Sequence, residues 1–94
     1  MKKVSIIIVT YNSEKDIYDC INSIIENSDI PLAEIELVVV DNNSTGCDTM
    51  FGKLKTLWGE DIILIKNSSN GGYGQGNNVG IRQCSAPVVL IMNP

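Results

Sequence analysis

Two runs of mostly β-branched residues restrict most strongly what this chain can fold into. Residues 4–9 and 35–40 are apolar on either face of a strand, whereas strands with one solvated face alternate between apolar and polar residues. Strands buried on both sides are typical of parallel sheets covered by helices. We therefore expect the two runs to be adjacent central strands of a parallel sheet. Shorter apolar runs at 62–65 and Val88–Met92 predict two further strands.

Amphipathic segments separate the four predicted strands. The first begins after Ser13, which together with Asp16 forms a start signal similar to a capping box. Its apolar face repeats at helical spacing in Ile17, Ile21, Ile24 and Ile25. A second helix is predicted from the same spacing in Met50, Phe51, Leu54, Leu57 and Trp58, with Gly59 closing it. A third covers residues 75–83. The order βαβαβαβ indicates an α/β, Rossmann-like fold with helices on both faces of a parallel sheet.

Length, charge and cysteine content narrow the classes of function. The 94 residues are enough for one small domain, 1–94, and no apolar run is long enough to cross a bilayer. A net charge of −4 argues against a nucleic-acid surface, which requires clustered lysine and arginine. The three cysteines are widely spaced, which fits neither a disulfide framework nor a zinc site and favours a reducing compartment. The absence of histidine from the sequence excludes Ser-His and Cys-His catalytic pairs within it.

Polar loops follow the predicted strands. In open parallel sheets, ligands bind beyond the carboxyl ends of the strands, so the candidate segments are 10–12, 41–44, 66–72 and Asn93. The first of them, Thr10-Tyr11-Asn12, has no glycine and cannot form the tight phosphate turn of a dinucleotide fold or a P-loop. Its ring, hydroxyl and amide suit a nucleoside base better than a pyrophosphate. The alternative is an ordinary strand-to-helix turn.

The other loops offer an acceptor and a glycine-rich stretch. Asp41 ends the second strand and can accept hydrogen bonds from a base imide or a ribose hydroxyl, or it caps the next turn. The segment 70–80 reads NGGYGQGNNVG, which differs by one residue from the dinucleotide fingerprint and follows the third strand rather than the first. Its glycines allow a ligand to approach the backbone closely, and Asn78 can reach neighbouring loops. A flexible turn before a glycine-rich helix start is the alternative.

Four segments, in order, resemble the family 2 glycosyltransferases with the GT-A fold. They are VSIIIVTYN at 4–12, VVVDNNST at 38–45, NGGYGQGNNVG at 70–80 and VVLIMNP at 88–94. The motifs NNST, NGGYGQGNNVG and MNP are most similar to those of the rhamnosyl and galactofuranosyl transferase branch. The resemblance covers essentially the whole chain. It implies that residues 1–94 form the N-terminal, nucleotide-sugar-binding half of a GT-A domain, with strand order 3-2-1-4.

The resemblance also implies which residues bind the nucleotide. They are Thr10, Tyr11, Asn12, Asp41, Asn43, Gly76, Asn78 and Asn93. The residues at 10–12 would line the base pocket and Asp41 would hydrogen-bond the base. Asn43 would support its loop. Gly76 and Asn78 would shape the floor near base and ribose.

The end of the sequence departs from the resembled family. Asn93 would stand where many relatives have the first carboxylate of a metal motif, a position that faces the ribose. The carboxylate that binds Mg²⁺ or Mn²⁺ would follow Pro94, and the general base would lie further on. The resemblance therefore implies a chain truncated before the metal motif, with no catalytic residue, no metal ligand and no activity alone. The family pattern also has an acid at Gly46, where the nearest acid here is Asp48.

The implied function is that of the parent enzyme. It would transfer a sugar with inversion from a nucleoside-diphosphate sugar to a saccharide or lipid-linked acceptor in polysaccharide biosynthesis, in the cytoplasm at the inner face of the membrane. The fragment would self-associate through its uncovered fourth strand. The alternative is a noncatalytic flavodoxin-like or receiver-like binding module, although a receiver needs acids after its first strand. A dinucleotide oxidoreductase is a third choice, but the glycine turn that should follow the first strand of such a fold is missing from this sequence.

Overall fold

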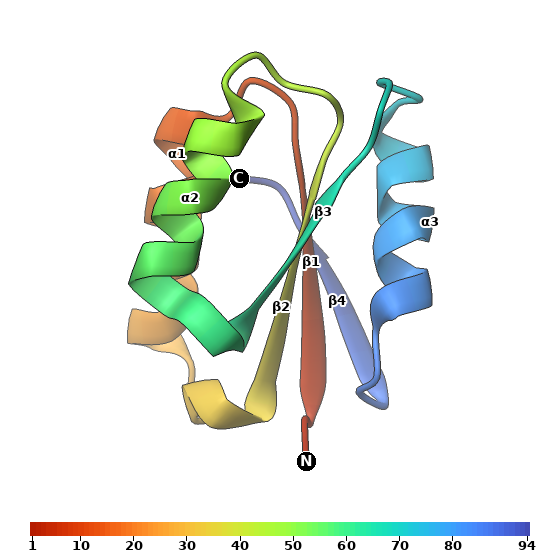
Figure 1. Ribbon diagram of the computed structural model, residues 1–94. Coiled ribbons are helices and arrows are strands. Elements are labelled where there is room, and N and C mark those ends of the chain that lie inside the picture. Colours follow the sequence, from red (N-terminus) through yellow and green to blue (C-terminus); the bar gives the residue numbers. More distant parts are fainter.

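The computed structural model describes residues 1–94, apart from the side chain of Glu60. The strands and helices, in chain order, are β1 (Val4–Thr10), α1 (Glu14–Asn27), β2 (Ile35–Asp41), α2 (Cys47–Trp58), β3 (Ile62–Lys66), α3 (Tyr73–Gln83) and β4 (Val88–Met92). Short 3-10 turns precede β2 and β3. All neighbouring strands are parallel, in the order β3-β2-β1-β4, as Figure 1 shows. The predicted fold class, strand order and central position of the first two strands are confirmed.

The register of the sheet brings the functional loops to one end. β1 pairs with β2 from Val4 opposite Ile35 to Thr10 opposite Asp41, and β1 pairs with β4 on its other side. The first two strands are each one residue longer than predicted, because Thr10 and Asp41 continue the ladder. The loops after β1, β2 and β3 therefore gather at the carboxyl edge, at the top of Figure 1.

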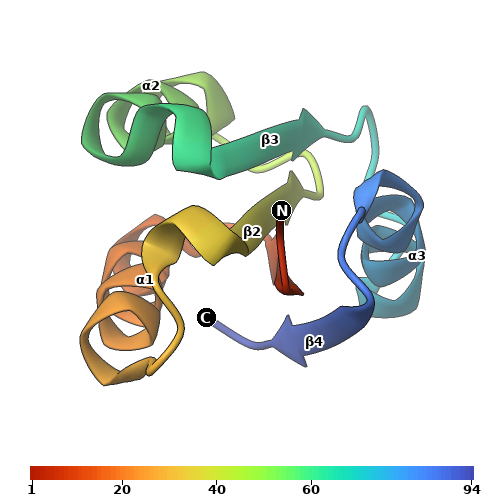
Figure 2. The ribbon, with the colours of Figure 1, turned by 90° about the horizontal axis from the view of Figure 1, so that it is seen from below.

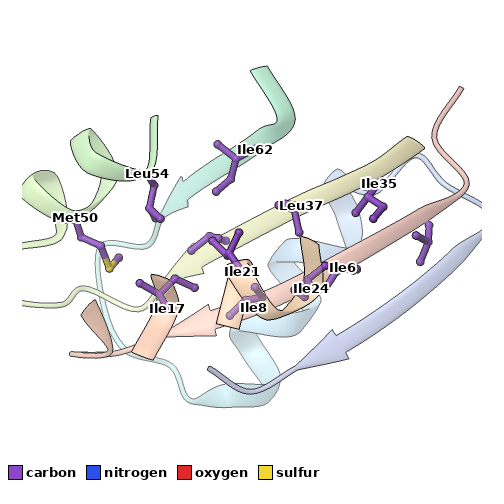
Figure 3. Close-up of a cluster of buried hydrophobic side chains, with 12 residues drawn as sticks. Ile6, Ile8, Ile17, Ile21, Ile24, Ile35, Leu37, Met50, Leu54 and Ile62 are labelled. Carbon is purple, nitrogen blue, oxygen red and sulfur yellow. The ribbon is translucent and has the colours of Figure 1, made fainter. Parts of the chain in front are cut away.

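Helices cover both faces of the sheet. α1 and α2 lie together on one face and α3 lies alone on the other, as Figures 1 and 2 show from two directions. The larger core, drawn in Figure 3, joins the inner faces of α1 and α2 to alternate strand residues such as Ile8, Leu37 and Val39. A smaller core under α3 contains Ile7, Val9, Val38 and Val40. Burial on both faces explains why the two central strands have few polar residues.

The start of α1 agrees with the prediction in position but not in its capping, and the start of α3 differs in position. The side chain of Ser13 makes no capping hydrogen bond to α1; its hydroxyl instead accepts from the Tyr11 N–H at 3.2 Å and donates to the Tyr11 carbonyl at 3.1 Å. The predicted capping box is therefore wrong, since this serine stabilises the loop before the helix. α3 begins at Tyr73, two residues earlier than predicted, after Gly72 with a φ of +92°. A positive φ favours glycine, which explains the residue at this point.

A buried carboxylate lies at the opposite, amino edge of the sheet. Glu36 accepts hydrogen bonds from the Ser5 hydroxyl and from the hydroxyl and N–H of Ser85, each at 2.8 Å. Burial alone would raise the pKa of Glu36, but these hydrogen bonds outweigh it and hold the pKa below its usual value. The network ties the turn between α3 and β4 to the two central strands.

β4 is the more exposed edge of the sheet. Four successive residues, Val88, Val89, Leu90 and Ile91, are 52%, 38%, 49% and 50% exposed. Both of its faces and one row of its backbone groups are thus uncovered, which is unusual for so apolar a strand. Among the described residues, no helix is both long enough and apolar enough to span a membrane.

Candidate functional site

A polar cleft opens at the carboxyl edge of the sheet. Its volume is about 390 Å³, and it lies between the loops after β1 and β2, the start of α3 and the end of β4. Its lining includes Tyr11, Ser13, Asn42, Asn70, Tyr73 and Asn93. A larger groove of about 560 Å³ runs between α1 and α2, but it is mostly apolar and lies away from these loops. Ligands of open parallel sheets bind beyond the strand ends, so the polar cleft is the candidate site.

Tyr11 is the aromatic side of the cleft that was predicted from the sequence. Its side chain is 52% exposed, and its backbone is held on both sides by the Ser13 hydroxyl. Val9, two residues earlier, also lines the cleft. Alternation along the strand thus directs Val9 and Tyr11 toward the face covered by α3, while the side chain between them points the other way.

Thr10 and Asp41 form a buried pair behind the cleft. Both residues are 0% exposed, and the Thr10 hydroxyl donates to Asp41 Oδ1 at 2.7 Å. The hydroxyl and the N–H of Ser44 donate to Asp41 Oδ1 and Oδ2, both at 2.7 Å. The Asp41 carboxylate therefore holds the loop after β2 in place. This is the role it would have as a cap of the turn, the alternative considered from the sequence. A direct contact between Asp41 and a base stays a prediction, and it requires a ligand to displace one of these hydrogen bonds.

The charge states of Asp41 and Cys47 follow from burial and hydrogen bonding together. Burial alone would raise the pKa of Asp41, but the hydrogen bonds from Ser44 and Thr10 outweigh it and lower the pKa below its ordinary value of 3.8. Burial and the adjacent carboxylate raise the pKa of the Cys47 thiol to about 12. Asp41 is therefore the ionised partner and Cys47 the neutral one at neutral pH.

Asn12 and Asn43 shape the neighbouring loops with left-handed backbones, at φ 53° and 65°. The Asn12 N–H donates to Ser44 Oγ at 2.7 Å, and Asn12 Oδ1 accepts from the Thr45 N–H at 3.2 Å. Asn12 thus fastens the loop after β1 to the loop after β2, while Asn43 is exposed at the tip of the second loop. Neither residue is part of the lining of the polar cleft.

Asn42 is a site residue that the sequence reasoning missed. It is 2% exposed, its Nδ2 donates to the Gly72 carbonyl at 3.1 Å, and its Oδ1 accepts from Asn67 Nδ2 at 2.8 Å. These bonds link the loop after β2 to the loop before α3. Strand alternation was the available signal, because Asn42 follows Val40 on the face covered by α3 and lines the cleft.

The remaining predicted residues differ in position. Asn93 lines the cleft. Gly76 lies beneath it, where a Cβ would come within 2.8 Å of Val9 and 3.2 Å of Asn42 Nδ2. Asn78 is exposed on α3 and outside the lining, whereas Asn77 beside it is buried with an Oδ1 atom that has no hydrogen-bond partner. Of the eight predicted residues, Tyr11 and Asn93 line the cleft directly.

The donor atoms of this cleft do not fit a divalent metal. Its side chains offer amides and hydroxyls, whereas Mg²⁺ and Mn²⁺ are held by at least one carboxylate in most protein sites. Asp41, the nearest carboxylate in the predicted site, is buried and already accepts three hydrogen bonds. Among the described residues, no three acidic, cysteine or histidine side chains are grouped as metal ligands.

Comparison with known proteins places the chain in a family. Residues 5–94 match the model described as glycosyl transferase family 2. The chain is 35% identical, over 94 residues, to the poly(ribitol-phosphate) beta-N-acetylglucosaminyltransferase TarS of Staphylococcus aureus strain MW2. The match covers 99% of this chain and 16% of TarS.

Solved structures agree with the sequence match. The crystal structure of S. aureus TarS 1-349 in complex with UDP superposes with a TM-score of 0.82 at 34% identity, covering 97% of this chain and 27% of that one. The mannosyltransferase PcManGT from Pyrobaculum calidifontis, in complex with GDP-Man and Mn²⁺, gives 0.85 at 27% identity with the same two coverages. The chain therefore spans less than a third of the length of these relatives. Because the family model matches nearly all of its residues and the sheet is parallel, this chain belongs to glycosyl transferase family 2.

Proposed function

We propose that residues 1–94 form the nucleotide-binding part of an enzyme that transfers a sugar from a nucleoside-diphosphate sugar. The observation that carries this proposal is the cleft at the carboxyl edge, where Tyr11 stands beside amide and hydroxyl groups. An exposed ring next to hydrogen-bonding groups suits the flat, polar edge of a nucleoside base. The acceptor is a saccharide or a lipid-linked saccharide, and the transfer proceeds with inversion.

The relatives support the class of ligand. TarS has been solved with UDP and with UDP-GlcNAc, and PcManGT with GDP-Man and Mn²⁺. We propose that the divalent ion and the catalytic carboxylates belong to parts of the enzyme outside residues 1–94, because the cleft lacks suitable donors. Residues 1–94 are then inactive alone. We further propose a cytoplasmic enzyme of polysaccharide biosynthesis at the inner face of the membrane, in the rhamnosyl and galactofuranosyl transferase branch.

A titration with UDP tests the proposed ligand. We expect weak, saturable binding that moves the amide resonances of Tyr11, Asn42 and Asn93 and does not depend on Mn²⁺. Affinity is low because the chain is acidic and the cleft has no cation to hold the diphosphate. Tyr11→Ala is expected to weaken binding about tenfold, since one base-stacking ring is lost.

The matched control is Leu57→Ala, which removes an exposed side chain from the groove between α1 and α2. It should leave the UDP affinity unchanged. Shifts confined to residues 66–72, with none at Tyr11, contradict the base site. Tighter binding of NAD or FMN than of UDP favours the noncatalytic binding module instead. Strong enhancement by Mn²⁺ contradicts a metal site outside these residues.

Residues 1–94 are expected to self-associate through β4. Its unpaired backbone edge and exposed Val89, Leu90 and Ile91 can pair with another copy. Sedimentation velocity across a hundredfold range of concentration should show dimers or larger species. Ile91→Lys should shift the distribution toward monomer, because a charged side chain on an edge strand opposes pairing. Ile81→Lys, which changes an exposed residue of α3, is the control and should leave the distribution unchanged. A monomer at every concentration contradicts the proposal.

A further inference from the structure

A second tyrosine lines the cleft together with Tyr11. Tyr73 is the first residue of α3 and comes from the loop after β3, whereas Tyr11 comes from the loop after β1. Its side chain is 43% exposed and belongs to neither hydrophobic core. Among the hydrogen bonds of the described side chains, none involves the hydroxyl of either tyrosine. A large aromatic surface left bare at the edge of a cleft favours a ligand that covers it.

The backbone of Gly72, the residue before Tyr73, is held by three hydrogen bonds. The Gly72 carbonyl accepts from Asn42 Nδ2 at 3.1 Å and from the Gly76 N–H at 3.1 Å, and the Gly72 N–H donates to Asn70 Oδ1 at 2.9 Å. Asn42 is almost fully buried, so it anchors this turn to the end of β2. The residue that follows Gly72 therefore starts from a fixed point, which reduces the entropy lost when its ring receives a ligand.

The chemistry of the lining selects a base over a phosphate. Besides the two rings, the lining contains the amides of Asn42, Asn70 and Asn93, and it has no lysine or arginine. Phosphate oxygens are bound by cations or by clustered N–H groups, whereas a neutral amide both donates and accepts. Flat, neutral groups with polar edges are what two rings and several amides can bind together. A nucleoside base has these properties.

We propose that Tyr73 forms a second aromatic wall of the cleft and, with Tyr11, holds the base of the nucleotide. Tyr73 is then a determinant of nucleotide affinity, and Asn42 is the residue that positions it through Gly72. This inference rests on the proposed function, since it assigns one further residue to the same nucleotide site.

The test compares Tyr73→Ala, Tyr73→Phe and wild type with three ligands. UDP and GDP carry a base, and ribose 5-phosphate does not. We expect Tyr73→Ala to weaken UDP and GDP binding about tenfold and to leave ribose 5-phosphate unchanged, because stacking requires the base. Tyr73→Phe retains the ring and should bind like wild type. UDP should also shift the ring protons of Tyr73 in the wild-type protein, an effect that a purely structural residue does not show.

Ile81→Ala is the matched control, since it removes another exposed side chain from α3 without touching the cleft. It should not change any of the three affinities. The inference alone is overturned if UDP still moves the Tyr11 resonances while Tyr73→Ala binds UDP within twofold of wild type. Equal weakening of ribose 5-phosphate also overturns it, because the ring would then contact the sugar. If wild type binds neither UDP nor GDP, the proposed function fails together with the inference.

Discussion

Asp41→Ala is expected to lower the free energy of unfolding by about 3–4 kcal/mol, because it leaves one buried and two half-buried donors without an acceptor. The Thr10 hydroxyl and both donors of Ser44 lose their partner, and each of the three hydrogen bonds is 2.7 Å long. Removing one partner of a buried hydrogen bond costs about 1–3 kcal/mol per orphaned group. Small domains have a total stability of roughly 5–15 kcal/mol, so this variant should be close to unfolding.

Urea denaturation followed by circular dichroism measures the effect. Asp48→Ala is the matched control, because Asp48 is an exposed carboxylate in the first turn of α2 and pairs only with Lys66 among the described ion pairs. It should cost at most about 0.5 kcal/mol. A loss of less than 1 kcal/mol in Asp41→Ala contradicts the loop-closing role. If the variant remains folded, a drop of one to two powers of ten in UDP affinity supports the predicted contact with the base.

Acid should act on the same carboxylate. The pKa of Asp41 in the folded chain lies below its ordinary value of 3.8, and that of Glu36 below its ordinary value of 4.5. A carboxyl whose pKa is lower in the folded state binds fewer protons there than in the unfolded state. The stability it provides is therefore complete above the ordinary pKa and is lost as the pH falls through the folded value. Denaturation midpoints should fall below pH 4.5 in wild type and change less with pH in Asp41→Ala.

The fold was predictable because several sequence signals agree. Strands with two apolar faces require covering helices, and the spacing of Ile17, Ile21 and Leu54 identifies two of them. The strand order came from the resemblance rather than from the pattern. The start of α3 was harder to locate, because Tyr73 and Gly74 have weak helix propensity and the turn is fixed by Asn42, a residue 30 positions away.

The sequence predicted which loops form the site, but not which of their side chains line the cleft. The four segments were expected at the carboxyl edge from strand topology alone, and all four contribute to the cleft. The direction of each side chain depends on whether a strand has ended. Thr10 and Asp41 still belong to the ladder and point under α1 and α2, whereas Tyr11 and Asn42 lie on the other face. Continuing the alternation of the strands by two residues would have separated these pairs.

Gly76→Ala is expected to destabilise the chain by about 1–3 kcal/mol, because α3 leaves no room for a methyl group at this position. The new Cβ would lie 2.8 and 3.0 Å from the two methyl groups of Val9 and 3.2 Å from Asn42 Nδ2. Val9 cannot move aside easily, since it is β-branched and lies on a central strand. The helix must therefore shift outward, which moves Tyr73 and strains the hydrogen bond from Asn42 to Gly72.

Gly74→Ala provides a control within the same helix, because a Cβ there meets no atom within 4 Å. The higher helix propensity of alanine should leave its stability equal to wild type or raise it by roughly 0.5–1 kcal/mol. Urea denaturation should thus show a loss of stability for Gly76→Ala and no loss for Gly74→Ala. Titration with UDP should show weaker binding for Gly76→Ala only, since its shifted helix disturbs the cleft. Equal stability of the two variants contradicts the close packing of α3 on β1. Equal UDP affinity of the two variants contradicts the expected effect of this packing on the nucleotide site.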